Sequence, residues 1–291
     1  MGNTARAVRV RAVVLIWSNL KLKEMKEKNV FNQWKLVNAQ LYWRQKQIDT
    51  ITETVHEFQP QGNSAEARIF GYVAIYLAYI AQFIERELES CLAAAEKEIN
   101  QIPNLAGDAP VDASLSRCLG IFDAATDTGM VVSELLARAQ RATSNATLLT
   151  LGQFGGIGLP LFSNDGGVDL YVACAEISKQ GLNSAIADLK KCLKLTKTYA
   201  SRAQSVEEYL SPSISSYASA VSMVTSANIF VETAEMLNQP VTDAGVFEND
   251  PAHHAKTKEI QVARIYAAGV ASGIINNHLK NVELWNIQFL N

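Results

Sequence analysis

Residues 34–58 read WKLVNAQLYWRQKQIDTITETVHEF, and this stretch decides the fold. Apolar side chains recur in it in alternating steps of three and four residues, with the charged residue Arg44 at the one odd position. The apolar members of the series are Trp34, Val37, Leu41, Ile48, Ile51, Val55 and Phe58. This spacing is a heptad repeat, which places the side chains along one seam of an α-helix. The stretch predicts a long helix that packs against other helices along that seam.

Glycine and proline extend this prediction to the rest of the chain. No Gly or Pro stands between Asn3 and Gln59, and later breaks at 60–62, 103–110, 151–167, 212 and 240–251 separate further long helical patterns. Short breaks between long helices make neighbouring helices antiparallel. We therefore expect an all-α protein, a single elongated domain over residues 1–291 built as a bundle of about five to six long antiparallel helices.

Residues that cap helices stand beside these breaks. Asn63, with Glu66 three residues later, fits a capping box, in which the Asn oxygen accepts a first-turn N–H and the Glu reaches back. Further expected caps are Asp112 for the third helix, and Ser211 and Asp250, each followed by a proline that can occupy the first helical position.

The second helical pattern is apolar on two faces, which predicts that this helix is central. One stripe consists of Ile69, Val73, Leu77, Ile80, Ile84, Leu88 and Cys91, and an aromatic stripe consists of Tyr72, Tyr76, Tyr79 and Phe83. In two later segments, small residues at helical spacing predict that the backbones of two helices approach each other closely. They are Ser215, Ser219, Ser222 and Ser226 in one segment, and Gly269 and Gly273 in another.

The N-terminal segment is basic although the whole chain has a net charge of −3. Residues 1–48 contain ten basic and two acidic residues, a net charge of +8, which leaves −11 on the remainder. One interpretation makes residues 1–17 an N-terminal arm that contacts a nucleic acid or an acidic partner through Arg6, Arg9 and Arg11, but the simpler interpretation that follows is the one we favour. The alternative is a solvated helix face that complements the acidic body. Alternation of apolar and basic residues over 5–17 fits a strand as well as a helix, so the conformation stays open.

The number of cysteines and the length of the apolar runs bear on where the protein is located. The four cysteines are too few and too scattered for a disulfide scaffold. The longest apolar run, Ile69–Ile84, is shorter than the ~20 residues that span a bilayer as a helix, and no signal-peptide pattern is present. We predict neither a signal peptide nor a transmembrane helix, and a location in a virion or the cytoplasm.

One segment departs from the helical pattern. Residues 148–172 read LLTLGQFGGIGLPLFSNDGGVDLYV, with a strong turn signal at 164–167 between alternating apolar residues. A Gly-rich apolar loop or a short β-hairpin is expected over 150–172. It is either a plain connector, a tongue that inserts into a membrane, or a contact with a neighbouring subunit. The last two uses would rest on Phe154, Ile157, Leu159, Leu161 and Phe162.

No motif names a reaction. The glycines of this segment lack the Lys and Ser/Thr of a phosphate-binding loop, and no His-x3-His pair suggests a metal site. Asp123 with Asp127, and Glu232 with Glu235, share helix faces, where paired carboxylates can do acid–base chemistry. Solvated helix faces explain them more simply. We expect no catalytic, cofactor-binding or metal-binding residues, and no enzyme.

These observations favour a non-enzymatic structural protein that assembles with copies of itself or other subunits into a larger particle, with a bacteriophage virion component as the preferred instance. The alternative is an α-helical pore-forming or membrane-inserting protein that uses residues 148–172 as an apolar tongue. That likeness is architectural and rests on no shared motif.

Overall fold

The computed structural model describes residues 2–58, 64–105, 108–150, 167–210, 214–238 and 251–290, and every regular element within these ranges is helical. The elements are α1 (Gly2–Phe58), α2 (Ala65–Gln101), the 3-10 helix η2 (Ile102–Asn104), α3 (Asp108–Thr150), α4 (Gly167–Leu210), α5 (Ile214–Asn238) and α6 (Pro251–Leu290). The predicted all-α bundle of long helices is confirmed.

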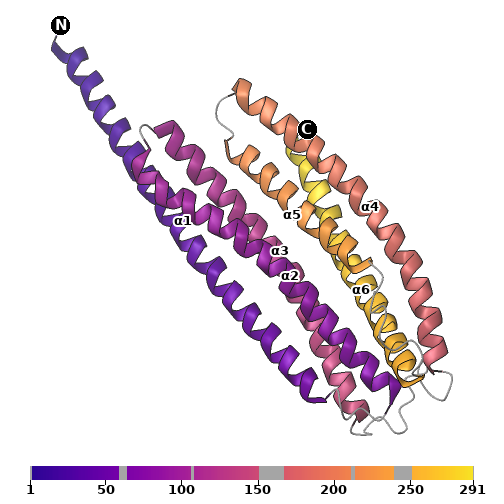
Figure 1. The fold of residues 1–291 in the computed structure, drawn as a ribbon. Coiled ribbons are helices and arrows are strands. Elements are labelled where there is room, and N and C mark those ends of the chain that lie inside the picture. Colours follow the sequence, from indigo (N-terminus) through magenta and orange to yellow (C-terminus); the bar gives the residue numbers. More distant parts are fainter. Residues whose placement is uncertain are drawn as a thin grey trace.

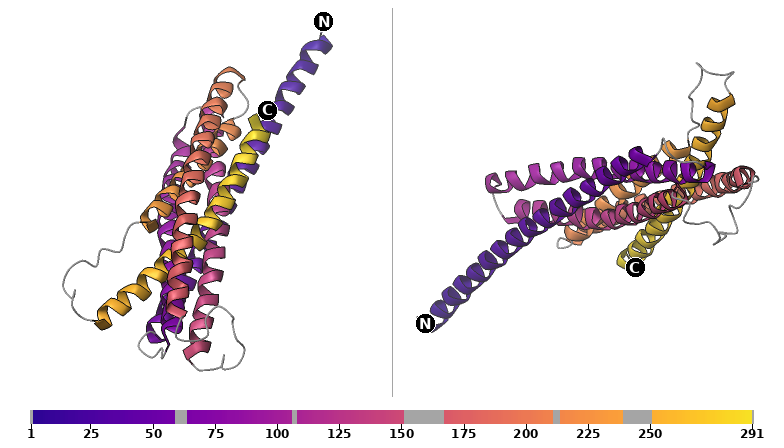
Figure 2. Two further views of the ribbon diagram at one scale, coloured as in Figure 1. Left: turned by 90° about the vertical axis from the view of Figure 1, so that its right-hand side faces the viewer. Right: turned by 90° about the horizontal axis from the view of Figure 1, so that it is seen from below.

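Successive helices run up and down an elongated bundle (Figure 1). One half of the bundle contains α1, α2 and α3, and the other contains α4, α5 and α6. The halves meet mainly where α3 packs on α5 and α2 packs on α6. The N-terminal end of α1 extends past the other helices in both views of Figure 2. This agrees with its length of 57 residues, against 37 in α2 and 43 in α3.

The central helix is α2, as its two apolar faces predict. It packs on α1, α3, α5 and α6, and its aliphatic stripe from Ile69 to Leu88 is at most 3% exposed. The aromatic stripe is only half-buried, and Tyr79 points largely to solvent. In the described part of the chain, only Ala65–Asn104 is long and apolar enough to cross a bilayer by length and composition, and most of its apolar window is buried in the bundle.

The helix ends follow the breaks in the sequence, with two corrections. The cap of α2 is Ser64 rather than Asn63, because the Ser64 hydroxyl oxygen accepts the Ala67 N–H at 3.1 Å. Asp112 lies inside α3 instead of capping it, and its carboxylate pairs with Lys26 of α1 at 2.9 Å. Pro251 opens α6 as expected, whereas Ser211 and Asp250 fall outside the described residues.

Two segments with strand-like alternation are helical. Residues 5–17 belong to α1, so the possible N-terminal arm continues the same helix. The return strand that the hairpin alternative needs at 168–172 is wrong, because α4 begins at Gly167 and Val168, Leu170 and Val172 lie in its first turns. The rest of the expected loop or hairpin, residues 151–166, lies outside the described residues.

Close backbone packing occurs between α3 and α5. A Cβ atom at Gly120 would lie 2.8 Å from the carbonyl atoms of Ala218, so only glycine fits there. The Thr128 hydroxyl donates to the buried Ser226 hydroxyl at 3.3 Å nearby, which confirms that the serine face of α5 is a packing face. The prediction for Gly273 is wrong, because no atom of another element lies within 4 Å of its would-be Cβ. The alanines of the same helix make the contact instead: Ala267, Ala268 and Ala271 are fully buried.

Candidate assembly interface

The buried side of α1 fixes the orientation of the whole helix. Val37, Ile48 and Ile51 of the heptad seam are almost fully buried, as is Val30, seven residues before Val37 on the same side of the helix. Arg44 is buried in the same seam. Its Nη2 donates to Oε2 of Glu85 in α2 at 3.3 Å, and its Nε donates to the other carboxylate oxygen. A polar residue at a seam position sets the register of a helix pair, because a shifted helix would leave both charges without a partner.

The third helix also accommodates this ion pair. A Cβ atom at Gly129 of α3 would lie 2.6 Å from Nη1 of Arg44, so glycine makes room for the guanidinium group. Burial raises the pKa of Glu85, and the hydrogen bond from Arg44 opposes that rise. Arg44, Glu85 and Gly129 therefore hold α1, α2 and α3 together in one register, which in turn determines which side chains α1 presents outward.

The outward side of α1 is apolar to an unusual degree. Half of the large hydrophobic side chains that are exposed in the described part of the chain belong to this helix. They are Met25, Phe31, Leu36, Tyr42 and Trp43, each between 47% and 62% exposed. Met25, Leu36 and Trp43 fall on one line of the helix, because steps of 11 and 7 residues bring a side chain back to nearly the same angle. Phe31 and Tyr42 form a second line on the other flank.

Cations accompany these rings. Lys35 Nζ lies 4.4 Å from the ring centroid of Phe31, and Lys46 Nζ lies 5.8 Å from that of Trp43. Phe31 also stacks on Trp34 at 5.8 Å. Lysine over an aromatic face is held by the ring quadrupole while its charge stays available to a partner. We call the side chains of Met25, Phe31, Lys35, Leu36, Tyr42, Trp43 and Lys46 the α1 face, a surface that is both aromatic and cationic.

A hollow of about 410 Å³ lies between α3, α5 and α6. Asp123 and Asp127 of α3 stand at it, with Met130 beside them and Met223 on α5. Partial burial raises the pKa of both aspartates, and the Asp123 charge raises the pKa of Asp127 further. Neither carboxylate forms an ion pair with any described residue. We call this place the acidic hollow.

His278 of α6 also borders the acidic hollow. Burial lowers the pKa of its imidazole to about 4, and the ring packs edge-on against Phe230 at 4.9 Å between centroids. The imidazole is therefore neutral at pH 7. No group of three or more His, Cys, Asp or Glu residues in the described ranges is arranged to hold a metal ion. In the other carboxylate pair, Glu232 with Glu235, Glu235 forms a surface ion pair with Lys190 at 2.7 Å.

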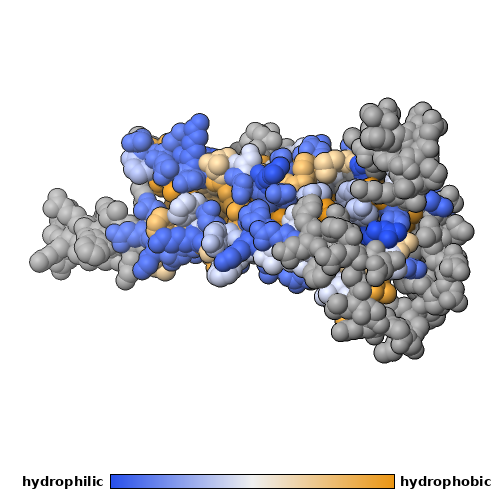
Figure 3. Space-filling view, turned by 60° about the horizontal axis from the view of Figure 1, so that its bottom comes forward, coloured by the Kyte–Doolittle hydropathy of each residue, from blue (hydrophilic) through white to orange (hydrophobic). Residues whose placement is uncertain are grey.

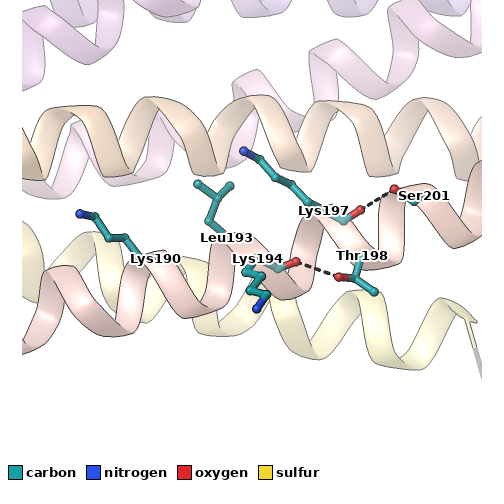
Figure 4. A pocket seen from close by; sticks show the side chains of 6 residues that line it. All are labelled: Lys190, Leu193, Lys194, Lys197, Thr198 and Ser201. Carbon is teal, nitrogen blue, oxygen red and sulfur yellow. Dashed lines mark hydrogen bonds between the residues drawn. The ribbon is translucent and has the colours of Figure 1, made fainter.

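A second hollow, of about 450 Å³, follows α4 and is lined by lysines (Figure 4). Lys190 is neutralised by Glu235, whereas Lys194 and Lys197 have no ion-pair partner in the described part of the structure. The hydroxyl groups of Thr198 and Ser201 donate to carbonyls of their own helix, each at 3.0 Å. No large hydrophobic side chain is exposed on the described part of α4, so this surface has charge without apolar area.

The described structure does not test the predicted interaction residues. Arg6, Arg9 and Arg11 lie in the N-terminal part of α1, where the helix is described but the side chains are not. Phe154, Ile157, Leu159, Leu161 and Phe162 lie outside the described residues. The cysteines described here, Cys91, Cys118 and Cys192, are free, and burial raises the pKa of the Cys118 thiol to about 12.

Sequence reasoning missed the α1 face, although its signal was present. Met25, Leu36 and Trp43 are large apolar residues at positions outside the heptad seam. A helix with one buried seam leaves such positions in solvent, so they could have been singled out once the seam was assigned. Comparison with family models, with curated proteins and with solved structures finds no match to this chain.

Proposed function

We propose that this chain is a non-enzymatic structural protein that assembles through α1 into a larger oligomeric particle. The observation that carries the proposal is the α1 face, where five large hydrophobic side chains of one helix are about half exposed or more. Clustered apolar side chains on a soluble surface mark protein–protein contacts more often than scattered ones do. Aromatic residues in particular are enriched at interfaces.

The dimensions of α1 support this use. At 1.5 Å per residue its 57 residues span about 85 Å. The α1 face itself runs from Met25 to Lys46, 22 residues or about 33 Å, so it supplies part of the roughly 800 Å² that each partner buries in a stable interface. Figure 3 shows one side of the molecule, on which hydrophobic side chains reach the surface in separate patches among hydrophilic ones. The proposed interface therefore includes surface beyond the α1 face.

The test is the molar mass in solution, measured by size-exclusion chromatography with light scattering. Wild-type protein is expected to exceed the monomer mass of 31.8 kDa, and Leu36→Glu/Trp43→Glu is expected to run as a monomer. A matched control is Tyr79→Glu/Tyr266→Glu, which alters exposed rings on α2 and α6 and leaves α1 intact. Circular dichroism checks that the variants fold. A wild-type monomer at high concentration contradicts the proposal.

The virion setting is one instance of such a particle. Neighbouring genes for capsid, portal or tail proteins would support it, and their absence from the genomic neighbourhood would oppose it.

Membrane insertion through residues 148–172 is a second candidate, favoured by where that segment is attached. The end of α3 at Thr150 and the start of α4 at Gly167 lie at the same end of the bundle (Figure 1). We propose that an apolar segment joined to these two helix ends contacts a bilayer that the bundle meets end-on. Leakage of dye from liposomes tests it: deletion of residues 154–162 should abolish leakage, and leakage that survives the deletion contradicts it.

A further inference from the structure

We infer that α1 of one copy docks into the acidic hollow of a second copy, so that copies join head to tail. The inference rests on the proposed assembly through α1 and names the surface that receives it. The α1 face supplies aromatic rings with lysines beside them. The acidic hollow supplies two carboxylates beside methionine side chains.

Charge disfavours the simpler contact between two α1 helices. Residues 1–48 carry a net charge of +8, so two such segments side by side would repel each other. The lysine-lined hollow on α4 is excluded as a receptor for the same reason. The receptor must be acidic, and the remainder of the chain carries −11. Charge complementarity therefore points α1 toward a surface on the body of another copy.

The acidic hollow is suited to that role by its carboxylates. Asp123 and Asp127 are one helical turn apart and share a face, so their negative charges repel each other. No described cation offsets that repulsion. Lys35 and Lys46 lie 11 residues apart on one line of α1, about 16 Å along the helix, so one of the two can face the aspartate pair. A lysine from the α1 face of a second copy would therefore supply the positive charge that the carboxylates of Asp123 and Asp127 lack within one copy.

The apolar part of the hollow matches the rings. Met130 is 61% exposed, and Met223 and Val282 lie on the adjoining walls. Thioether side chains are flexible and polarisable, and they pack favourably on aromatic rings. The volume of about 410 Å³ lies within the roughly 300–1,000 Å³ of clefts that hold ligand groups. Trp43 is the largest exposed side chain of the α1 face, and we expect it to fill the acidic hollow of the second copy.

The two surfaces belong to different elements of one copy. The α1 helix packs on α2 and α3, whereas the hollow opens between α3, α5 and α6. One copy can therefore use both surfaces at once, each with a different neighbour. A contact between two different surfaces repeats without limit unless rotation closes it into a ring. The expected product is a ring or a filament rather than a two-fold dimer.

The test uses two variants of the full chain and their mixture. Lys35→Glu/Lys46→Glu disables the α1 face, and Asp123→Lys/Asp127→Lys disables the acidic hollow. Each variant alone is expected to be monomeric by light scattering. An equimolar mixture is expected to assemble beyond twice the monomer mass of 31.8 kDa, because the intact surfaces of the two variants complement each other and so do their two charge-reversed surfaces. The four substitutions in one chain are expected to restore assembly, because the charges are then exchanged.

Matched controls change exposed charges elsewhere: Glu96→Lys/Glu232→Lys on α2 and α5, and Lys191→Glu/Lys194→Glu on α4. Both are expected to assemble as wild type. If Asp123→Lys/Asp127→Lys assembles normally while Leu36→Glu/Trp43→Glu is monomeric, α1 has another partner surface and this inference is wrong while assembly through α1 stands. If Leu36→Glu/Trp43→Glu also assembles normally, the proposed function itself fails.

Discussion

Arg68 and Glu259, which are 191 residues apart in the chain, join the two halves of the bundle through a two-pronged ion pair. Arg68 Nε donates to one oxygen of the Glu259 carboxylate at 2.9 Å, and Nη2 donates to the other at 2.7 Å. The carboxylate is almost fully buried, and the guanidinium is partly exposed. Paired geometry of this kind makes charge-assisted hydrogen bonds both stronger and more directional.

Glu259→Gln is expected to lower the free energy of unfolding by about 1–3 kcal/mol, because it replaces a charge-assisted pair with a weaker contact at a buried site. The matched control is Glu235→Gln, which breaks the exposed Lys190–Glu235 pair and should cost less than about 1 kcal/mol. Urea denaturation followed by circular dichroism measures both. If both variants lose the same free energy of unfolding, burial does not make the Arg68–Glu259 pair more stabilising than an exposed pair.

Arg44→Met is expected to destabilise the protein by about 3–5 kcal/mol at pH 7, because it leaves the Glu85 carboxylate buried without a counter-ion. The double variant Arg44→Met/Glu85→Leu should recover most of that loss, since two apolar side chains can replace a buried ion pair. A double variant no more stable than Arg44→Met would contradict this account.

Arg44→Met is also expected to change how the free energy of unfolding depends on pH. The folded-state pKa of Glu85 is already raised by burial, and loss of Arg44 removes the interaction that lowers it. The folded state then binds the proton more tightly than the unfolded chain. The contribution of Glu85 to stability is therefore most favourable below the ordinary pKa of a carboxylate and is lost as pH rises through its raised folded-state pKa. The destabilisation by Arg44→Met should be smaller at pH 4 than at pH 7 in the same denaturation experiment.

Gly120→Ala is expected to cost about 1–3 kcal/mol, because the new Cβ would press on the Ala218 backbone and force α3 away from α5. Gly181→Ala in α4 is the control. No atom of another element lies within 4 Å of its would-be Cβ, so the higher helix propensity of alanine should stabilise the protein by up to about 1 kcal/mol. Thermal denaturation should move the two midpoints in opposite directions. A shift of the same sign for both would rule out the close contact.

His278 is expected to titrate with a pKa of about 4 in the folded protein, which NMR of the imidazole proton measures directly. Because the folded pKa lies below the ordinary value, His278 favours the folded state above pH 6.5, and that stabilisation is lost as pH falls towards 4. The loss amounts to up to about 3 kcal/mol. His278→Phe, which keeps a ring against Phe230, should reduce this part of the acid sensitivity. An imidazole that titrates near 6.5 would show that the ring is not buried.

Much of the fold could be predicted, because helix-forming patterns are local. The absence of Gly and Pro from Asn3 to Gln59 predicted one uninterrupted helix, and α1 fills that range to within a few residues. The return strand at 168–172 failed for a local reason as well. Asn, Asp and Gly favour a tight turn and also favour the start of a helix, so the run before Val168 fits both.

The contacts between helices could not be predicted in the same way. Arg44 stood out as the one charged residue in an apolar seam, but its partner Glu85 is 41 residues away and nothing local identifies it. The acidic hollow was visible only as two aspartates on one face of a helix. The methionines and His278 that complete it come from packing among three helices, which a single sequence does not specify.

The length of α1 has a consequence for the thermodynamics of association. Its N-terminal end reaches beyond the helices that pack against it (Figure 2), and a helix without tertiary packing is only marginally stable in water. The helix–coil equilibrium of that end is therefore linked to whatever binds it. Helical content should rise with protein concentration, and the heat capacity change on dilution should include a contribution from local unfolding.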